Sequence, residues 1–366
     1  MHHRRFFIFG SAIALAGLLG ACGDDTSDAD GGDDTGADTG ADTAVDTGDD
    51  TTTGPVVEPT WEPAIADDDR GAFMSVWGPS GDEVYTVGGQ PTIGELAGSR
   101  VAMRYDGSTW SDLEVPEGGM LNWVHGADGV VWMVGENGAA LRFEDGEFVE
   151  EVDTGAGTNL WGIWCARADR CWAVGGNARD AESTPVLVEL DGTNWSTVAL
   201  PETERPARAL FKIWGLDEDT IIAVGSVGLA YHYDGTTWTE GATGVGVDLI
   251  SLWGRGPNDI VAAGGRINGQ LARWDGTEWT TEVLGGVPGL NGVWMNREGT
   301  AYSAGVNGRI VRVAAGTFEA EAMDSPAERV VHAVWGTDSG PFFAVGGSLD
   351  RNPPYVGEIV FAPGAE

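Results

Sequence analysis

Basic residues are scarce in this sequence, which limits the partners that the protein can bind. Lysine and arginine together number 20 against 57 aspartates and glutamates, so the formal net charge is −37, and Lys212 is the single lysine. A surface this acidic repels polyanions. The composition therefore disfavours nucleic-acid binding, although it does not define a partner.

The sequence has only one long apolar run, and it lies at the N-terminus. Residues 6–19 form an apolar stretch of fourteen residues, which is short for a membrane span. The stretch follows Arg4 and Arg5, so residues 1–21 are predicted to be an export signal and not part of the fold. Loss of the two arginines with this signal leaves a formal net charge near −39.

Cysteine is also rare, and the first of the three cysteines follows the signal directly. The segment Leu19-Gly20-Ala21-Cys22 resembles the lipobox of bacterial lipoproteins. The resemblance implies that Cys22 is lipidated and becomes the mature N-terminus; an ordinary cleaved signal peptide is the alternative. In enteric bacteria an aspartate after this cysteine holds the protein at the inner membrane, and here the residue is Gly23. The resemblance thus implies an outer-membrane lipoprotein of the cell envelope, periplasmic or surface-exposed, held to the membrane only by its N-terminal lipid.

The next segment, residues 22–54, lacks the residues that a folded core needs. Residues 23–54 contain eleven aspartates and one valine, with no lysine, arginine or aromatic residue. Such a chain cannot offset its ordering entropy by burying apolar surface, and its like charges extend it. We predict a disordered acidic tether. Its aspartates faintly resemble a calcium loop, but the closing glutamate and the fixed spacing are missing.

Residues 55–366 form one block that is built from repeats. The block is rich in Gly, Val, Ala and Trp and has no long stretch of helical apolar period, which indicates an all-β fold. A strand that ends at an anchor residue, followed by a strand that ends in glycine, occurs seven times. The anchors recur every 39 to 50 residues, which is typical of radial repetition. They are Trp77, His125, Trp164, Trp214, Trp253, Trp294 and Trp335.

Each repeat is predicted to contain four strands, and the last repeat is completed from the other end of the chain. The third and fourth strands are joined by Asp-Gly turns, as at Asp234-Gly235, which need positive φ. The seventh unit ends before a fourth strand, whereas an unpaired Thr60-Trp61-Glu62 segment stands before the first unit. We therefore predict a seven-bladed β-propeller of four-stranded blades, closed by an N-terminal outer strand that carries Trp61. We interpret Trp61 and the anchor tryptophans as structural.

Two motifs in the repeats resemble those of known propellers. Paired glycines after the second strand, as at Gly88-Gly89 and Gly264-Gly265, with a later aromatic-Asp and Trp, resemble the kelch repeat. Asp-Gly-x-x-Trp is similar to the Asp-box of sialidase-like propellers, which has one more residue between Asp and Gly. The layout also resembles propeller lipoproteins of Gram-negative bacteria. These resemblances imply the fold but not an activity, because propellers host unrelated functions.

Three departures from the repeat are candidates for function. Cys165 and Cys171 occur in one hairpin of the third unit, where an exported chain favours a disulfide over a metal pair. His125 replaces an anchor tryptophan and His332 lies in a first strand; either could face the channel, and both are interpreted as structural. Long loops between the second and third strands gather arginines on one face. The residues predicted to bind an anionic ligand there are Arg100, Arg179, Arg266, Asn268 and Arg351. The alternative is that these arginines pair with acidic neighbours.

Two functions remain open at this point. The first is a non-catalytic binding or scaffold module, monomeric and without cofactor or metal, whose partner is an envelope protein or a glycan. The second is a carbohydrate-active enzyme or an acidic-glycan-binding lectin. The Arg-Ile-Pro segment of sialidases is missing, and the nearest string is Arg266-Ile267-Asn268. No catalytic set stands out in the sequence, which favours the binding module.

Overall fold

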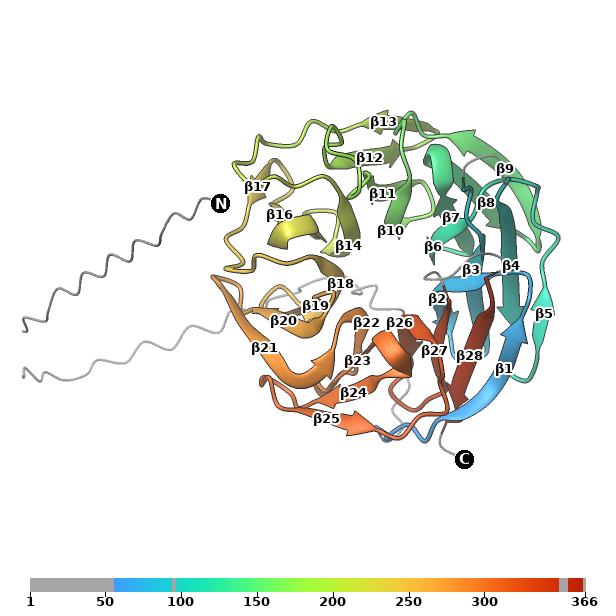
Figure 1. The fold of residues 1–366 in the computed structure, drawn as a ribbon. Coiled ribbons are helices and arrows are strands. Elements are labelled where there is room, and N and C mark those ends of the chain that lie inside the picture. Colours follow the sequence, from blue (N-terminus) through green and yellow to red (C-terminus); the bar gives the residue numbers. More distant parts are fainter. Residues whose placement is uncertain (1–55, 94–96, 349–354, 365–366) are drawn as a thin grey trace, which may run out of the picture. The chain divides into compact units, whose positions relative to one another are not determined.

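The structure, a computed structural model, describes residues 56–93, 97–348 and 355–364, all within one compact unit. Seven antiparallel sheets of four strands each follow one another around a ring (Figure 1). This arrangement confirms the predicted all-β, seven-bladed propeller. The predicted signal, the tether and Cys22 lie outside the described residues.

The first three blades follow the chain in order, each from its innermost to its outermost strand. Blade 1 contains β2 (Ala72–Ser80), β3 (Glu83–Gln90), β4 (Ser99–Tyr105) and β5 (Trp110–Asp112). Blade 2 contains β6 (Leu121–Ala127), β7 (Val130–Gly135), β8 (Ala139–Glu144) and β9 (Glu147–Asp153). Blade 3 contains β10 (Leu160–Arg167), β11 (Arg170–Gly175), β12 (Val186–Asp191) and β13 (Asn194–Thr197).

The next three blades repeat this order. Blade 4 contains β14 (Leu210–Asp217), β15 (Thr220–Gly225), β16 (Ala230–Tyr233) and β17 (Trp238–Glu240). Blade 5 contains β18 (Leu249–Gly256), β19 (Asp259–Gly264), β20 (Asn268–Trp274) and β21 (Trp279–Pro288). Blade 6 contains β22 (Leu290–Met295), β23 (Ala301–Gly305), β24 (Ile310–Val313) and β25 (Ala320–Met323).

Blade 7 is built from both ends of the described chain. It contains β26 (Val330–Gly336), β27 (Phe342–Gly347) and β28 (Gly357–Ala362), and its outer strand is β1 (Glu62–Asp68). β1 pairs antiparallel with β28, with Glu62 opposite Phe361. Trp61 is buried beside the strand, and its ring centre lies 6.5 Å from that of Phe342. The predicted closing strand is confirmed, and it covers an edge that blade 7 would otherwise expose.

The glycine that ends each second strand is required by a close backbone approach. A Cβ atom added at Gly175 would lie 2.2 Å from the carbonyl oxygen of Asn159, just before the first strand of the same blade. The same approach, at 2.0 to 2.3 Å, occurs at the equivalent glycine of all seven blades. No side chain fits at such a distance, so this column of glycines serves the blade and not a ligand.

The Asp-Gly turns form as the sequence predicts, and the aspartate side chain caps them. Gly107 has a φ of 90°, and Asp106 accepts hydrogen bonds from the backbone N–H groups of Ser108 (3.0 Å) and Thr109 (2.8 Å). Hydrogen bonds led by that from Thr109 lower the pKa of Asp106 to about 2. Asp234 and Asp275 cap their turns in the same way.

The connections between second and third strands differ in length around the ring. Blades 2, 4 and 6 use three-residue 3-10 turns: η1 (Glu136–Gly138), η2 (Ser226–Gly228) and η3 (Val306–Gly308). Blades 1, 3 and 7 have longer connections, whereas in blade 5 only residues 265–267 join β19 to β20, so the long connection expected there is not formed. We call the face of the propeller that carries these connections the loop-rich face. In the part of the chain that the structure describes, no helix has the length and apolar character needed to cross a bilayer.

Candidate functional site

Every first strand carries a β-bulge at its second or third residue, next to the loop-rich face. In blade 5, for example, Leu249 pairs with Gly264 and Ser251 with Ala263, so Ile250 has no partner. A bulge bends the strand and redirects the side chain of the unpaired residue. Because the first strand begins opposite the end of the second, all seven bulges lie at the same end of the channel. The bulge residues are Met74, Asn122, Trp161, Phe211, Ile250, Asn291 and His332.

Blades 3, 4 and 5 place apolar bulge residues side by side at this end of the channel. Trp161, Phe211 and Ile250 are each partly exposed and belong to none of the hydrophobic core clusters. Two exposed apolar residues of blade 5, Val247 (43% exposed) and Ile267 (83%), adjoin Asp248 and Arg266 in sequence, and that ion pair lies at the Phe211 ring. We call these five residues the mouth patch. They do not contribute to the core in the way that the repeat columns do.

Polar contacts hold parts of the mouth patch in place. The indole Nε1 of Trp161 donates a hydrogen bond of 2.7 Å to the carbonyl oxygen of Gly176. The guanidinium of Arg266 lies over the ring of Phe211 at 5.7 Å and pairs with Asp248 at 2.8 Å. Aromatic rings fixed in this way present a defined surface at the mouth of the channel.

The residues predicted to bind an anionic ligand do not all reach this patch. Arg266 is there, with its side chain 61% exposed, and Asn268 follows it at the start of β20. The Arg100 side chain is only 4% exposed; it pairs with Glu151 at 2.7 Å and donates to the carbonyl oxygen of Gly119. Arg179 lies exposed in the long loop of blade 3, and Arg351 lies outside the described residues.

Other arginines of the loop-rich face are engaged with carboxylates. Arg205 pairs with Glu240 at 3.0 Å, and Arg329 pairs with Asp67. These contacts correspond to the alternative in which arginines neutralise acidic neighbours. Of the predicted ligand residues, Arg266 combines an exposed guanidinium with a place in the mouth patch.

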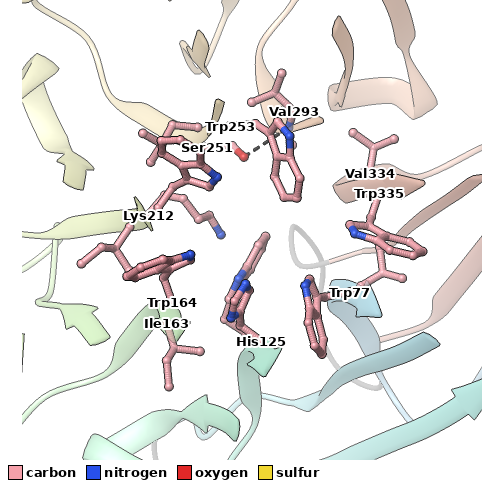
Figure 2. A pocket seen from close by; sticks show the side chains of 16 residues that line it. Trp77, His125, Ile163, Trp164, Lys212, Ser251, Trp253, Val293, Val334 and Trp335 are labelled. Atoms are coloured by element: carbon pink, nitrogen blue, oxygen red, sulfur yellow. Dashed lines mark hydrogen bonds between the residues drawn. The ribbon is translucent and has the colours of Figure 1, made fainter. Parts of the chain in front are cut away.

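The anchor residues surround the axis of the propeller. Figure 2 shows the side chains of Trp77, His125, Trp164, Trp253 and Trp335 around a common space. Trp77, Trp164, Trp214, Trp294 and Trp335 are at most 5% exposed, whereas Trp253 is partly exposed. A Cβ atom at Gly215 would lie 2.6 Å from the ring of Trp164, so an indole of one blade packs on a glycine of the next. The same packing occurs at Gly126 against Trp77 and at Gly254 against Trp214, so it explains the glycine after three of the anchor positions.

His125 takes the place of an anchor indole and also links two blades. Its ring centre lies 4.8 Å from that of Trp77, and its Nδ1 accepts a hydrogen bond of 3.2 Å from the backbone N–H of Cys165 in blade 3. Burial lowers the pKa of His125 to about 3, so the ring is neutral. A neutral ring that accepts at Nδ1 carries its proton on Nε2.

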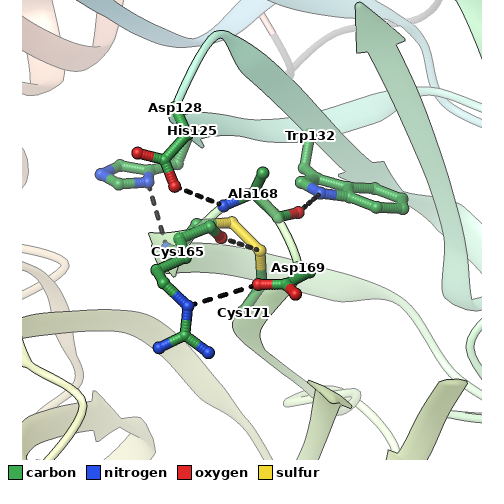
Figure 3. The surroundings of a disulfide bond; sticks show 8 residues. His125, Asp128, Trp132, Cys165, Ala168, Asp169 and Cys171 are labelled. Atoms are coloured by element: carbon green, nitrogen blue, oxygen red, sulfur yellow. Dashed lines mark hydrogen bonds and ion pairs between the residues drawn. A yellow bond between two sulfur atoms is a disulfide. The ribbon is translucent and has the colours of Figure 1, made fainter. Parts of the chain in front are cut away.

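The predicted disulfide is present, and it fastens the hairpin that contacts blade 2. Cys165 and Cys171 face each other across β10 and β11, with Cα atoms 4.0 Å apart (Figure 3). At the hairpin tip the N–H of Ala168 donates to Asp128, and its carbonyl accepts from Trp132 Nε1 at 3.1 Å. Residues 165–171 thus form a closed, rigid corner between two blades.

Two other histidines, His232 and His332, are partly buried. Burial lowers the pKa values of His232 and His332 to about 4. His232 accepts a hydrogen bond of 2.9 Å from Trp279 Nε1. Among residues 56–93, 97–348 and 355–364, no three His, Cys, Asp or Glu side chains are grouped so that they could hold a metal ion.

Comparisons with known proteins give the fold and no family. No protein-family model matches the sequence, and no curated protein does either. Solved structures that match include the WD40 β-propeller domain of Doa1, with 12% identity and a TM-score of 0.60 over 82% of this chain and 96% of that one. The WD40 repeats of RRP9 match at 8% identity and a TM-score of 0.61 over 83% and 97%. The structure of U3-55K matches at 9% and 0.62 over 85% and 100%. The likeness to kelch and Asp-box propellers stays a prediction from the sequence.

Proposed function

We propose that this chain is a non-catalytic binding or scaffold module, anchored by lipid in the bacterial cell envelope, which holds a protein partner at the mouth patch. The observation that carries the proposal is the set of apolar side chains that bulges redirect to the loop-rich face. Trp161, Phe211 and Ile250 lie partly exposed outside the core. Val247 and Ile267 extend the same surface.

The composition of this surface is that of a protein interface. Interfaces between proteins are enriched in aromatic residues and arginine at the centre, within a polar rim. Residues that dominate binding energy are most often Trp, Tyr and Arg. Trp161, Phe211 and Arg266 supply this chemistry, and the pair of Arg266 with Asp248 supplies the polar edge. A protein partner therefore fits the patch better than a substrate does.

A matched pair of exposed apolar residues tests this assignment. A photo-crosslinking amino acid is placed at Ile267 in the mouth patch, or at Val149 on the outer strand β9, which is 51% exposed. In intact envelopes of the full-length protein, Ile267 is expected to give a discrete adduct that Phe211→Ala weakens, while Val149 gives none. Adducts of equal yield at both positions would contradict the proposal.

The lipid anchor is proposed from the segment around Cys22 and has its own test. Cells that express the full-length protein are labelled with radioactive palmitate and then fractionated. The wild type is expected to carry label and to sediment with the outer membrane, whereas Cys22→Ser loses both properties. A labelled Cys22→Ser protein would overturn the anchor and leave the binding surface unaffected.

One observation favours acidic glycans as a second class of ligand. The exposed Arg266 guanidinium above the Phe211 ring combines a cation with an aromatic platform. Acidic sugars would raise the melting temperature of the protein in this case, because a ligand at a hundred times its Kd adds about 2.7 kcal/mol of stability. The gain would disappear in Arg266→Ala. Asn268, two residues from Arg266, and Arg179, exposed in the long loop of blade 3, are further residues proposed to contact such a ligand, together with Arg351.

A further inference from the structure

Two blades depart from the repeat two residues before the anchor. Five blades have a small residue there, and the small residue packs against the first strand of the next blade. Ser251 Oγ, for example, accepts a hydrogen bond of 3.2 Å from the backbone N–H of Val293. Blades 2 and 4 have Trp123 and Lys212 instead, and both side chains line the axial cavity. The five small residues are Ser75, Gly162, Ser251, Gly292 and Ala333.

Lys212 is the only lysine of the chain, and its amine is buried on the axis. The residue is 5% exposed, and its Nζ lies over the ring of Trp123. No carboxylate lines the cavity, and the amine makes no hydrogen bond or ion pair with any residue that the structure describes. Burial lowers the pKa of this amine well below its usual value. A lone buried cation is costly unless something pairs with it.

The polar groups around this cavity are almost all hydrogen-bond donors. The Nε1–H groups of Trp77 and Trp164 are buried without an acceptor among the described residues. Figure 2 shows these two nitrogens and the Lys212 amine turned toward the enclosed space. His125 accepts at Nδ1, so its Nε2 is a further donor, and the hydroxyl of Ser251 already accepts from Val293. Buried donors without acceptors require an explanation, of which a bound ion is one.

We infer that the axial cavity beside Lys212 binds one small monovalent anion, of halide or formate size. The cavity volume of about 30 Å³ accommodates one such ion. The anion would pair with the protonated amine and accept from N–H groups of the anchors, where such charge-assisted contacts are strong. The inference concerns the channel and does not depend on the partner proposed for the mouth patch.

Binding of the anion is coupled to protonation of Lys212. The site takes up the anion together with a proton whenever the free amine is neutral. Affinity therefore falls as pH rises above the pKa of the free amine, by tenfold per pH unit. Exposed arginines, which keep their charge over this range, would give no such dependence.

The test uses tryptophan fluorescence and thermal melting of the purified protein in sodium bromide or formate, with sulfate at matched ionic strength. Bromide and formate are expected to give saturable responses and sulfate none, with affinity falling between pH 6 and pH 10. Lys212→Met should abolish the saturable response. Arg142→Ala, which also loses one positive charge but at a residue of β8 that pairs with Glu144, should retain it.

Three results would overturn the inference. One is a bromide response of the wild type that is only linear and collisional. Another is a saturable response that persists in a folded Lys212→Met variant. The third is an affinity of the wild type for bromide that does not change with pH. This result would overturn the inference even if Lys212→Met does not fold.

Discussion

Among the anchors, Trp164 is the residue whose replacement should lower the free energy of unfolding most. It is 2% exposed, and its ring packs on Gly215 of the next blade and stacks at 5.6 Å on Trp172. Trp164→Ala is expected to lower the free energy of unfolding by about 3–5 kcal/mol. Trp253→Ala, at a partly exposed anchor, should cost less. Urea unfolding of both variants makes the comparison, and equal losses would contradict the packing described here.

Three histidines with lowered pKa values should make the protein sensitive to acid. His125 has a pKa of about 3, and His232 and His332 have pKa values of about 4. All lie below the unfolded value of about 6.5, so the unfolded state binds these protons first and stability is lost as pH falls below about 6.5. Each group contributes at most about 1.4 kcal/mol per pH unit. Melting temperatures from pH 8 to pH 4 should fall, and less steeply for His332→Ala.

Individual residues show where sequence could predict the site and where it could not. The anchors and the closing glycines were predictable, because seven copies place them at one position. The bulge residues were missed, because a bulge breaks the alternation that strand prediction uses; comparison of the third residue before each anchor would have found Trp161 and Phe211. Lys212 was missed because its environment depends on Trp123, in another blade.

The turn η2 carries strain that the equivalent turns of blades 2 and 6 avoid. Val227 has a φ of 50°, whereas the corresponding residues are Asn137 (59°) and Asn307 (61°). Asparagine tolerates this conformation and β-branched residues do not. Val227→Asn is expected to raise the free energy of unfolding by about 1 kcal/mol, and Asn307→Val to lower it by a similar amount. Chemical denaturation measures both changes. A loss of stability in Val227→Asn would show that the apolar contacts of Val227 are worth more than the relief of its backbone strain.

The disulfide stabilises one hairpin, and its removal should be mild. Closure of a loop this short is worth about 2 kcal/mol in the chain-entropy model. The double variant Cys165→Ser/Cys171→Ser is expected to stay folded and to lose roughly that stability by urea unfolding. The effect should be local, because the hairpin contacts blade 2 through Ala168 and the backbone of Cys165. Failure of the variant to fold would show that the corner between the blades is required for assembly.

The whole ring depends on β1, which comes from the opposite end of the chain. Deletion of residues 56–68 would expose the edge of β28 and remove Trp61 from the core of blade 7. Exposed edge strands pair with other chains. The shortened protein is therefore expected to dimerise or aggregate in light scattering after size-exclusion chromatography. A monomer with an unchanged melting temperature would contradict the role of the closing strand.

At the scale of the molecule, the sequence predicts the architecture because the same short strand pattern occurs seven times, although a single copy would be ambiguous. The orphan Thr60-Trp61-Glu62 was sufficient to predict closure, since it matched the outer strands of other blades. The candidate site was less predictable, because it is assembled from residues of different blades. Arg100 and Arg266 look alike in sequence, yet one is 4% and the other 61% exposed at the side chain.

The central claim is that the mouth patch is the surface on which a protein partner is held. The direct measurement is the Kd of the partner cross-linked from Ile267, determined by calorimetry with wild-type protein, Phe211→Ala and Val149→Ala. Loss of an aromatic side chain at the centre of an interface weakens the free energy of binding by about 2 kcal/mol or more. Binding is expected to be at least tenfold weaker for Phe211→Ala and unchanged for Val149→Ala. Equal Kd values for all three proteins, each with an intact melting transition, would contradict it.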